Sequence, residues 1–214
     1  MKTEGVILKS KNLGDRLRYL SVYTEKLGKL NLLVKLQSND FPIKYELFSV
    51  TLFKLQQKGK NWEILEGNLI KENFPRTPEE FKFRVRITKL LTPLELAPSS
   101  RIYTLLKKYI AENGNPPTYT AFLVKFLFLE GLMPQLFRCI KCGSRNVSWF
   151  SVEKGGVLCK NCREGETIRW NRSASMETLI LIKEPLESLK KRRFKWLNRI
   201  ELAAEKHLRY RTEK

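Results

Sequence analysis

The four cysteines of the chain form two Cys-x-x-Cys pairs, Cys139 with Cys142 and Cys159 with Cys162, and sixteen residues separate the pairs. Two thiolates three positions apart can bind one cation at a tight turn, and two such pairs supply the closed tetrahedral sulfur set of a structural zinc ion. Gly143 follows the first pair, where a glycine lets backbone amides turn toward the sulfur. The spacing therefore predicts one zinc ion bound by all four cysteines; it argues against two disulfides and against cysteines that only pack.

The residues between and around the two pairs predict a small ribbon over residues 136–166. Residues 147–152 alternate as a strand does, and Gly155-Gly156 marks a turn before Val157.

No other residues form a catalytic set that the sequence makes recognisable. The one histidine, His207, lies in a charged C-terminal segment and is predicted to be at the surface. The cysteines are assigned to metal, no carboxylate pair has a recognisable setting, and both the P-loop and the dinucleotide glycine patterns are missing from the sequence. We therefore predict that the chain is not an enzyme.

The charge of the chain is strongly positive. Lysine and arginine number 41 against 22 aspartate and glutamate, which gives a net charge of +19. Such an excess attracts polyanions, of which phosphate backbones are the commonest. The alternative is a thermostable protein with a lysine-rich solvated surface, but such proteins usually contain a matching number of glutamates. We expect a nucleic-acid partner.

The first 76 residues predict a small β-barrel. β-Rich runs separated by turn signals occur at residues 5–9, 16–23, 29–35, 45–55 and 62–70. Five such strands suggest an oligonucleotide-binding (OB) barrel, which binds nucleic acid through a basic groove and aromatic platforms. The candidate DNA-binding groove residues are Lys9, Lys11, Arg16, Arg18 and Lys35, and the candidate platforms are Tyr19, Tyr23 and Trp62. An aromatic on an alternating strand is more often a core residue, and a lysine at a strand end is often only solvated.

Residues 77–214 predict an α-helical domain that carries the ribbon, so the fold class is α+β. Thr77-Pro-Glu-Glu80 is a capping box with proline at the first helical position. Further helices are expected to start at Ser99 or Ser100, at Pro116-Pro117-Thr118, and at Ser173 or Ser175, and a last amphipathic helix is expected over residues 189–210. The helix after Pro117 is apolar nearly all round and should be the central one. Basic residues crowd the start of the last helix, where Arg192, Arg193 and Lys195 are candidate DNA contacts or charges left in water.

The start Met1-Lys-Thr-Glu4 has no apolar signal segment, and the chain has no run of eighteen apolar residues. We expect a soluble, cytoplasmic, nucleoid-associated protein with no membrane partner.

Several segments in order along the chain resemble the RecO family of bacterial DNA repair proteins. They are Glu4-Gly-Val-Ile-Leu-Lys9, Leu13-Gly-Asp15, residues 19–24, Gly28-Lys29, Leu136-Phe-Arg-Cys-Ile-Lys-Cys-Gly143 and Gly155-Gly-Val-Leu-Cys159. The resemblance implies an OB barrel and a helical domain with a zinc ribbon. It also implies a recombination mediator that binds single- and double-stranded DNA, anneals complementary strands, engages the tail of single-strand-binding protein, and works with RecR to help RecA load.

The chain departs from the family in one loop. Relatives carry a glycine- and arginine-rich run after the third strand, where this chain has residues 34–41. Two other binding classes stay open. A zinc-ribbon RNA-binding or ribosome-associated factor would show the same charge, and a pure protein-interaction module would bind an acidic peptide without salt-sensitive DNA affinity.

Overall fold

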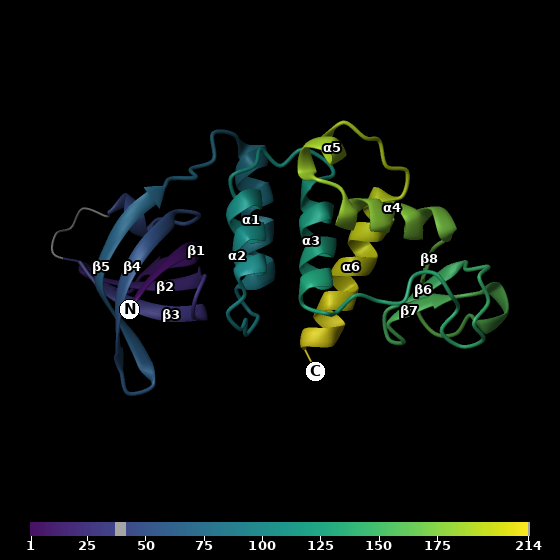
Figure 1. Cartoon of the computed structure of the whole chain (residues 1–214), viewed down its shortest axis with the longest axis horizontal. Helices are drawn as coiled ribbons and strands as arrows, with labels where there is room; N and C mark the ends of the chain where they lie inside the picture. Colours follow the sequence, from purple (N-terminus) through teal and green to yellow (C-terminus); the bar gives the residue numbers. More distant parts are fainter. Residues whose placement is uncertain (37–41, 214) are drawn as a thin grey trace. The chain divides into compact units, whose positions relative to one another are not determined.

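The computed structural model describes residues 1–36 and 42–213, so part of the loop after the third strand lies outside the described residues. The chain divides into two compact units, Met1–Gly114 and Asn115–Lys214 (Figure 1). The first unit groups two helices with the barrel. The domain boundary expected after residue 76 stays a prediction.

Five antiparallel strands form the sheet of the first unit, in the order β3-β2-β1-β4-β5. The strands are β1 (Lys2–Asn12), β2 (Leu17–Thr24), β3 (Gly28–Lys35), β4 (Val50–Lys58) and β5 (Asn61–Lys71). The two edge strands, β3 and β5, lie against each other, which curls the sheet into an OB-type barrel, as predicted. The fourth strand starts later than expected, because Ile43–Tyr45 form a 3₁₀ turn and Phe48 has a φ of 75°.

The barrel core is built from the alternating inward residues of these strands. Ile7, Leu20, Leu32 and Phe53 are at most 1% exposed and pack into one cluster. Tyr23 is also fully buried, and its hydroxyl donates to the carbonyl of Ala97 at 3.0 Å. The prediction that Tyr23 is a base-stacking platform is therefore wrong, since its position on the alternating strand turns it into the core.

Two capped helices complete the first unit, α1 (Pro78–Leu91) and α2 (Ser100–Tyr109). The Thr77 side chain accepts a hydrogen bond from the Glu80 amide, and the Ser99 side chain accepts one from the Ile102 amide, so both predicted caps are confirmed. Each cap satisfies a backbone N–H that a helix start leaves without a partner.

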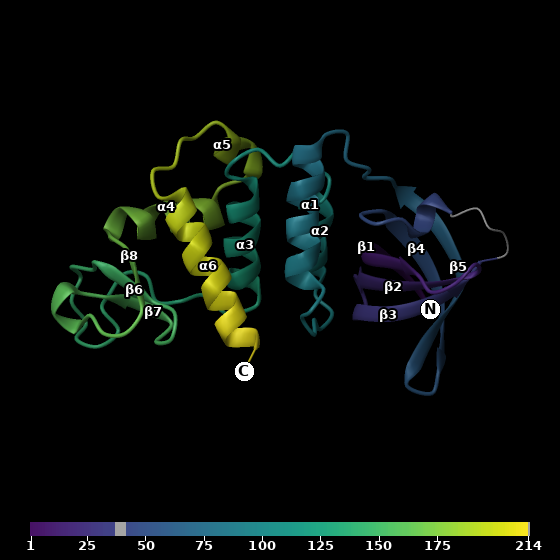
Figure 2. The ribbon, with the colours of Figure 1, turned by 180° about the vertical axis from the view of Figure 1, so that it is seen from behind.

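The second unit is a helical bundle with a small sheet (Figure 2). Its helices are α3 (Thr118–Leu129), α4 (Arg172–Lys183), α5 (Leu186–Lys190) and α6 (Leu197–Thr212). Helix α3 packs against the other three and buries nine of its twelve residues, which confirms that it is central. Helix α4 starts earlier than predicted, because Asn171 rather than a serine caps it.

The last predicted helix is in fact two helices with a break between them. Residues 191–196 separate α5 from α6. In that break the Glu177 carboxylate accepts hydrogen bonds from the amides of Lys195 (3.1 Å) and Trp196 (2.8 Å), so a distant acidic side chain caps α6. The prediction of one continuous helix over residues 189–210 is wrong for this reason.

The ribbon is a three-stranded sheet in the order β7-β6-β8. Its strands are β6 (Trp149–Ser151), β7 (Gly156–Leu158) and β8 (Thr167–Arg169), with a 3₁₀ turn at Lys160–Cys162. The inner face packs on the bundle, where Phe150 contacts Trp170 and His207. His207 is 2% exposed, so the prediction that it lies at the surface is wrong; its position on α6 turns it toward the ribbon. Among the described residues, no helix is long and apolar enough to cross a membrane.

Candidate metal centre and nucleic-acid interface

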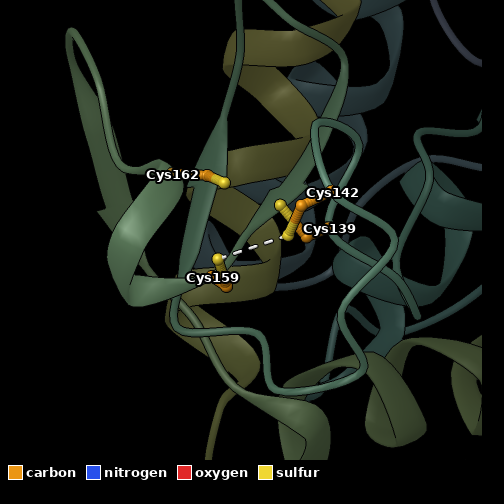
Figure 3. A group of neighbouring side chains, drawn as sticks. All are labelled: Cys139, Cys142, Cys159 and Cys162. Atoms are coloured by element: carbon orange, nitrogen blue, oxygen red, sulfur yellow. Dashed lines mark hydrogen bonds between the residues drawn. The ribbon is translucent and has the colours of Figure 1, made fainter.

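The four cysteines meet at one end of the ribbon, and Figure 3 shows their side chains converging from the two turns. At the first turn the Gly143 amide donates to the Cys139 carbonyl at 2.8 Å, and Gly143 has the left-handed φ of 75° that suits glycine. At the second turn the Cys162 amide donates to the Cys159 carbonyl at 3.3 Å. These two tight turns bring together sulfur atoms from two segments of the chain that sixteen residues separate.

The sulfur positions fit a tetrahedral metal ion. All four Sγ atoms lie within 4.8 Å of one another, and those of Cys142 and Cys159 are 3.7 Å apart. Zinc–sulfur bonds of about 2.3 Å in a tetrahedron place sulfurs roughly 3.8 Å apart, whereas a disulfide needs about 2.05 Å. All four cysteines are free. Together they form a four-cysteine metal-binding cluster.

The protonation of these thiols also suits a cation. Burial alone would raise the pKa of Cys139, but amide donors of Cys159, Cys142 and Lys141 outweigh it and lower that pKa to about 6. The pKa of Cys162 is instead raised, because its thiol hydrogen-bonds the neighbouring sulfurs of Cys159 and Cys142. One thiolate is thus already favoured near neutral pH, and a bound cation would favour the remaining three.

The barrel brings three of the predicted DNA-binding lysines onto one outer face. Lys11 pairs with Tyr19 across β1 and β2, and Leu17 pairs with Lys35 across β2 and β3. Lys9 lies on the same face, with its Nζ 5.9 Å from the centre of the Tyr19 ring. We call Lys9, Lys11, Tyr19 and Lys35 the barrel face. The three lysines are exposed and have no carboxylate partner among the described residues.

The barrel face also contains apolar residues that the sequence analysis did not single out. Leu33, which pairs with Tyr19, is 55% exposed, and Leu17 is 38% exposed. The Tyr19 hydroxyl donates to Asn31 Oδ1 at 2.8 Å, which fixes the ring. Leu17 and Leu33 alternate with core residues along their strands, and this pattern in the sequence indicates that they face solvent. Only the strand register shows that they flank Tyr19.

Arg18 does not belong to this face. It is 8% exposed and points to the other side of β2, where its Nε donates to Asn12 Oδ1 at 2.7 Å and its Nη1 lies 3.3 Å from Glu46 Oε1. Its charge is therefore used inside the protein and not on the barrel face. Arg16 is exposed in the turn between β1 and β2, and Trp62 is half-buried against the barrel core.

The C-terminal candidates lie in the second unit, in the break between α5 and α6. Arg192 and Arg193 are exposed, as is Lys195. Arg192 Nη2 lies 2.7 Å from Glu184 Oε1, so part of its charge is offset. These residues form a basic loop rather than the basic helix face that was expected.

Comparison with known proteins decides the family. A family model described as "Recombination protein O C terminal" matches residues 87–204, which is more than half of the chain. The chain belongs to the RecO family. A RecO relative named "DNA repair protein RecO" from Thermoanaerobacter sp. (strain X514) is 28% identical over 180 residues, which cover 76% of this chain and 71% of that protein. The protein of the same name from Caldicellulosiruptor saccharolyticus is 26% identical over 205 residues, covering 89% and 84%.

Membership of the RecO family confirms the resemblance seen in the sequence and the role in DNA repair and recombination. It also agrees with the prediction that the chain is not an enzyme. The matched range contains the four-cysteine cluster and the ribbon, so the RecO assignment covers the metal centre as well as the bundle.

Proposed function

We propose that this RecO-family chain is a recombination mediator. It binds single- and double-stranded DNA, anneals complementary strands, and helps load RecA onto DNA coated by single-strand-binding protein, together with RecR. It works in the cytoplasm, on the nucleoid. The observation that carries the proposal is the barrel face, where three lysines that pair with no carboxylate of the described residues lie around a tyrosine held by Asn31.

The barrel face suits single-stranded DNA because it combines charge with an aromatic surface. The lysine ammonium groups can neutralise successive phosphates and release their counterions. The Tyr19 ring and the flanking Leu17 and Leu33 side chains offer an apolar surface on which bases can stack without sequence preference. Binding of this kind needs no base-specific contact.

Annealing follows from the same electrostatics. Two DNA strands repel each other through their phosphates, and a protein with a net charge of +19 lowers that repulsion when it binds them. Base pairing then drives the reaction, so no covalent step is needed. The surplus charge also suits the acidic tail of single-strand-binding protein as a partner.

We further propose that the metal held by Cys139, Cys142, Cys159 and Cys162 is one zinc ion with a structural role. The cluster supplies four protein ligands, the number that fills a tetrahedral site. The ion would thus fix the two turns to each other, since the described ribbon strands are only three residues long.

The proposal is tested by annealing two complementary oligonucleotides that are each coated with single-strand-binding protein. We expect the chain to accelerate duplex formation with the intact coating protein and to lose much of that acceleration when the acidic tail of the coating protein is deleted. Adding RecR and RecA should then give faster RecA filament assembly. Equal annealing with and without the chain would contradict the proposal.

A further inference from the structure

Beside the metal centre, the ribbon carries a stacked tryptophan and arginine; Trp149 packs against the cluster of Cys139, Leu158 and Cys159. Along β6, Phe150 turns inward to the bundle, so Trp149 turns to the opposite face, where it pairs with Arg169 of β8. The Arg163 guanidinium lies over the Trp149 ring, 3.8 Å from its centre, and its Nε donates to Thr167 Oγ1 at 3.3 Å. Both arginines are exposed.

Beyond the sheet, the segments before β6 and after β8 lie side by side. The Trp170 amide donates to the Ser148 carbonyl at 2.9 Å, so the segment before Trp149 runs beside the segment after Arg169. The two segments border an open cleft of about 480 Å³. It is lined by Arg145, Asn146, Val147, Asn171, Arg172 and Ser173.

The arginines of this face are free to bind an anion, because the nearby acids pair with lysines. Glu164 accepts a hydrogen bond from Lys141 and lies 3.6 Å from Lys154, and Glu166 lies 2.5 Å from Lys206. By contrast, within the part of the chain that the structure describes, no carboxylate pairs with Arg145, Arg163, Arg169 or Arg172.

We propose that this ribbon face, defined by Trp149, Arg163, Arg169, Arg145 and Arg172, is a second binding surface for single-stranded nucleic acid. Arginine guanidinium planes and aromatic rings stack on bases, and arginine also binds phosphate through two parallel hydrogen bonds. The Arg163 guanidinium, already held flat over the Trp149 indole, presents its other plane for a base and its free N–H groups for a phosphate, and Arg169 on β8 offers a second phosphate contact. The cleft between Arg145 and Arg172 can receive a further phosphate. An acidic peptide would use the arginines but not the flat stack, which is why the face favours nucleic acid.

This inference rests on the proposed function and deepens it. Annealing requires two strands on one protein or on two, and a chain with both a barrel face and a ribbon face could hold one strand on each. The ribbon would then be a working surface and not only a support for the helices.

The test compares full-length, zinc-loaded variants for binding to a fluorescent oligo(dT) by anisotropy. The variant Arg163→Gln with Arg169→Gln is made in the Lys9→Ala, Lys11→Ala, Lys35→Ala background, so that the barrel face does not mask the ribbon. Two phosphate contacts on single strands contribute about 1.4 to the slope of log affinity against log salt, which is roughly 25-fold in affinity at 0.1 M. We expect a loss of that size.

The matched control is Lys183→Gln with Lys191→Gln, which removes two exposed charges from the same unit and leaves the lysine partners of Glu164 and Glu166 in place. It should change binding less than threefold. Zinc content should be unchanged in the arginine and lysine variants. Because Trp149 packs against Cys139 and Cys159, its variants are compared at one bound zinc ion per chain, where Trp149→Leu should weaken binding and Trp149→Phe should retain most of it. Equal affinity of the arginine variant and its parent, or an equal loss in the lysine control, would overturn the ribbon face.

Strand annealing separates this failure from failure of the proposed function. If the wild type anneals and Arg163→Gln with Arg169→Gln anneals equally well, the ribbon face is wrong and the mediator role stands. A wild type that does not anneal at all contradicts the mediator role itself. If an acidic peptide binds the ribbon and oligo(dT) does not, the face is a protein-docking site and the inference is overturned.

Discussion

Removing the three lysines of the barrel face should change how binding depends on salt. Each phosphate contact on single-stranded DNA contributes about 0.7 to the slope of log affinity against log salt concentration, so Lys9→Ala, Lys11→Ala and Lys35→Ala together should reduce that slope by about 2. If the other contacts are unchanged, the loss is on the order of 100-fold at 0.1 M salt and shrinks toward 1 M. The three side chains are exposed and form no salt bridge with the residues that the structure describes, so folding should be unaffected.

The assay is fluorescence anisotropy with a labelled oligonucleotide across a range of salt concentrations. A charge-matched control removes Lys82, Lys89 and Lys108, which are exposed on α1 and α2 of the same unit. This control should lower the slope by less than half as much as the barrel variant does. If the slope of log affinity against log salt falls by the same amount in both variants, binding depends on the total charge of the unit and the barrel face has no special role.

Three further predictions concern metal, pH and packing. Cys142→Ser should reduce the zinc content, measured by elemental analysis, to well below one ion per chain. It should also lower the melting temperature of the second unit, measured by calorimetry. Burial lowers the pKa of His207, so the folded state binds fewer protons than the unfolded state. The free energy of unfolding should therefore fall as pH drops below about 6.5. Between pH 7.5 and pH 5.5, the melting temperature of the wild type should fall more than that of His207→Gln, so the difference between the two proteins should change with pH. An unchanged difference would contradict the buried, neutral imidazole. Phe122→Ala should cost about 3–5 kcal/mol in denaturant unfolding, since the ring is fully buried, whereas Phe128→Ala on the exposed side of the same helix should cost less than about 0.5 kcal/mol. Equal costs would show that α3 is not the core helix.

Much of the fold could be predicted because its signals are local. Alternation along the strands, the caps at Thr77 and Ser99, and the all-round apolar character of α3 each depend on residues within a few positions of one another. The metal cluster was predictable for a related reason. Each Cys-x-x-Cys pair is itself a local turn, and only the meeting of the two pairs needs tertiary structure.

The errors arose where a distant side chain decides the outcome. Arg18 looked like its basic neighbours, but Glu46, 28 residues further along the chain, forms an ion pair with it. The sequence of the last segment predicts one continuous helix. In the structure Glu177, eighteen residues before Lys195, accepts hydrogen bonds at the start of the second half and so separates it from the first. His207 looked like a surface residue because basic residues surround it in sequence, whereas its helical position faces Phe150.

The sequence also could not show which exposed residues share a surface. Lys9, Tyr19 and Lys35 come from three strands, and a register shift between Ile7 and Lys9 helps to set which face the lysine occupies. The stack of Arg163 on Trp149 depends in the same way on how the ribbon folds back. Strand register, which a single sequence does not reveal, is therefore what assembles both proposed nucleic-acid surfaces.

The most direct test of the central claim is the rate at which two bare complementary oligonucleotides anneal at low salt. The wild type should accelerate duplex formation several-fold over the protein-free rate. The Lys9→Ala, Lys11→Ala, Lys35→Ala variant should lose most of that acceleration, and the Lys82, Lys89, Lys108 control should keep it. An annealing rate that is the same with wild type, with the barrel variant and without protein would contradict the claim that positive charge on the barrel brings strands together.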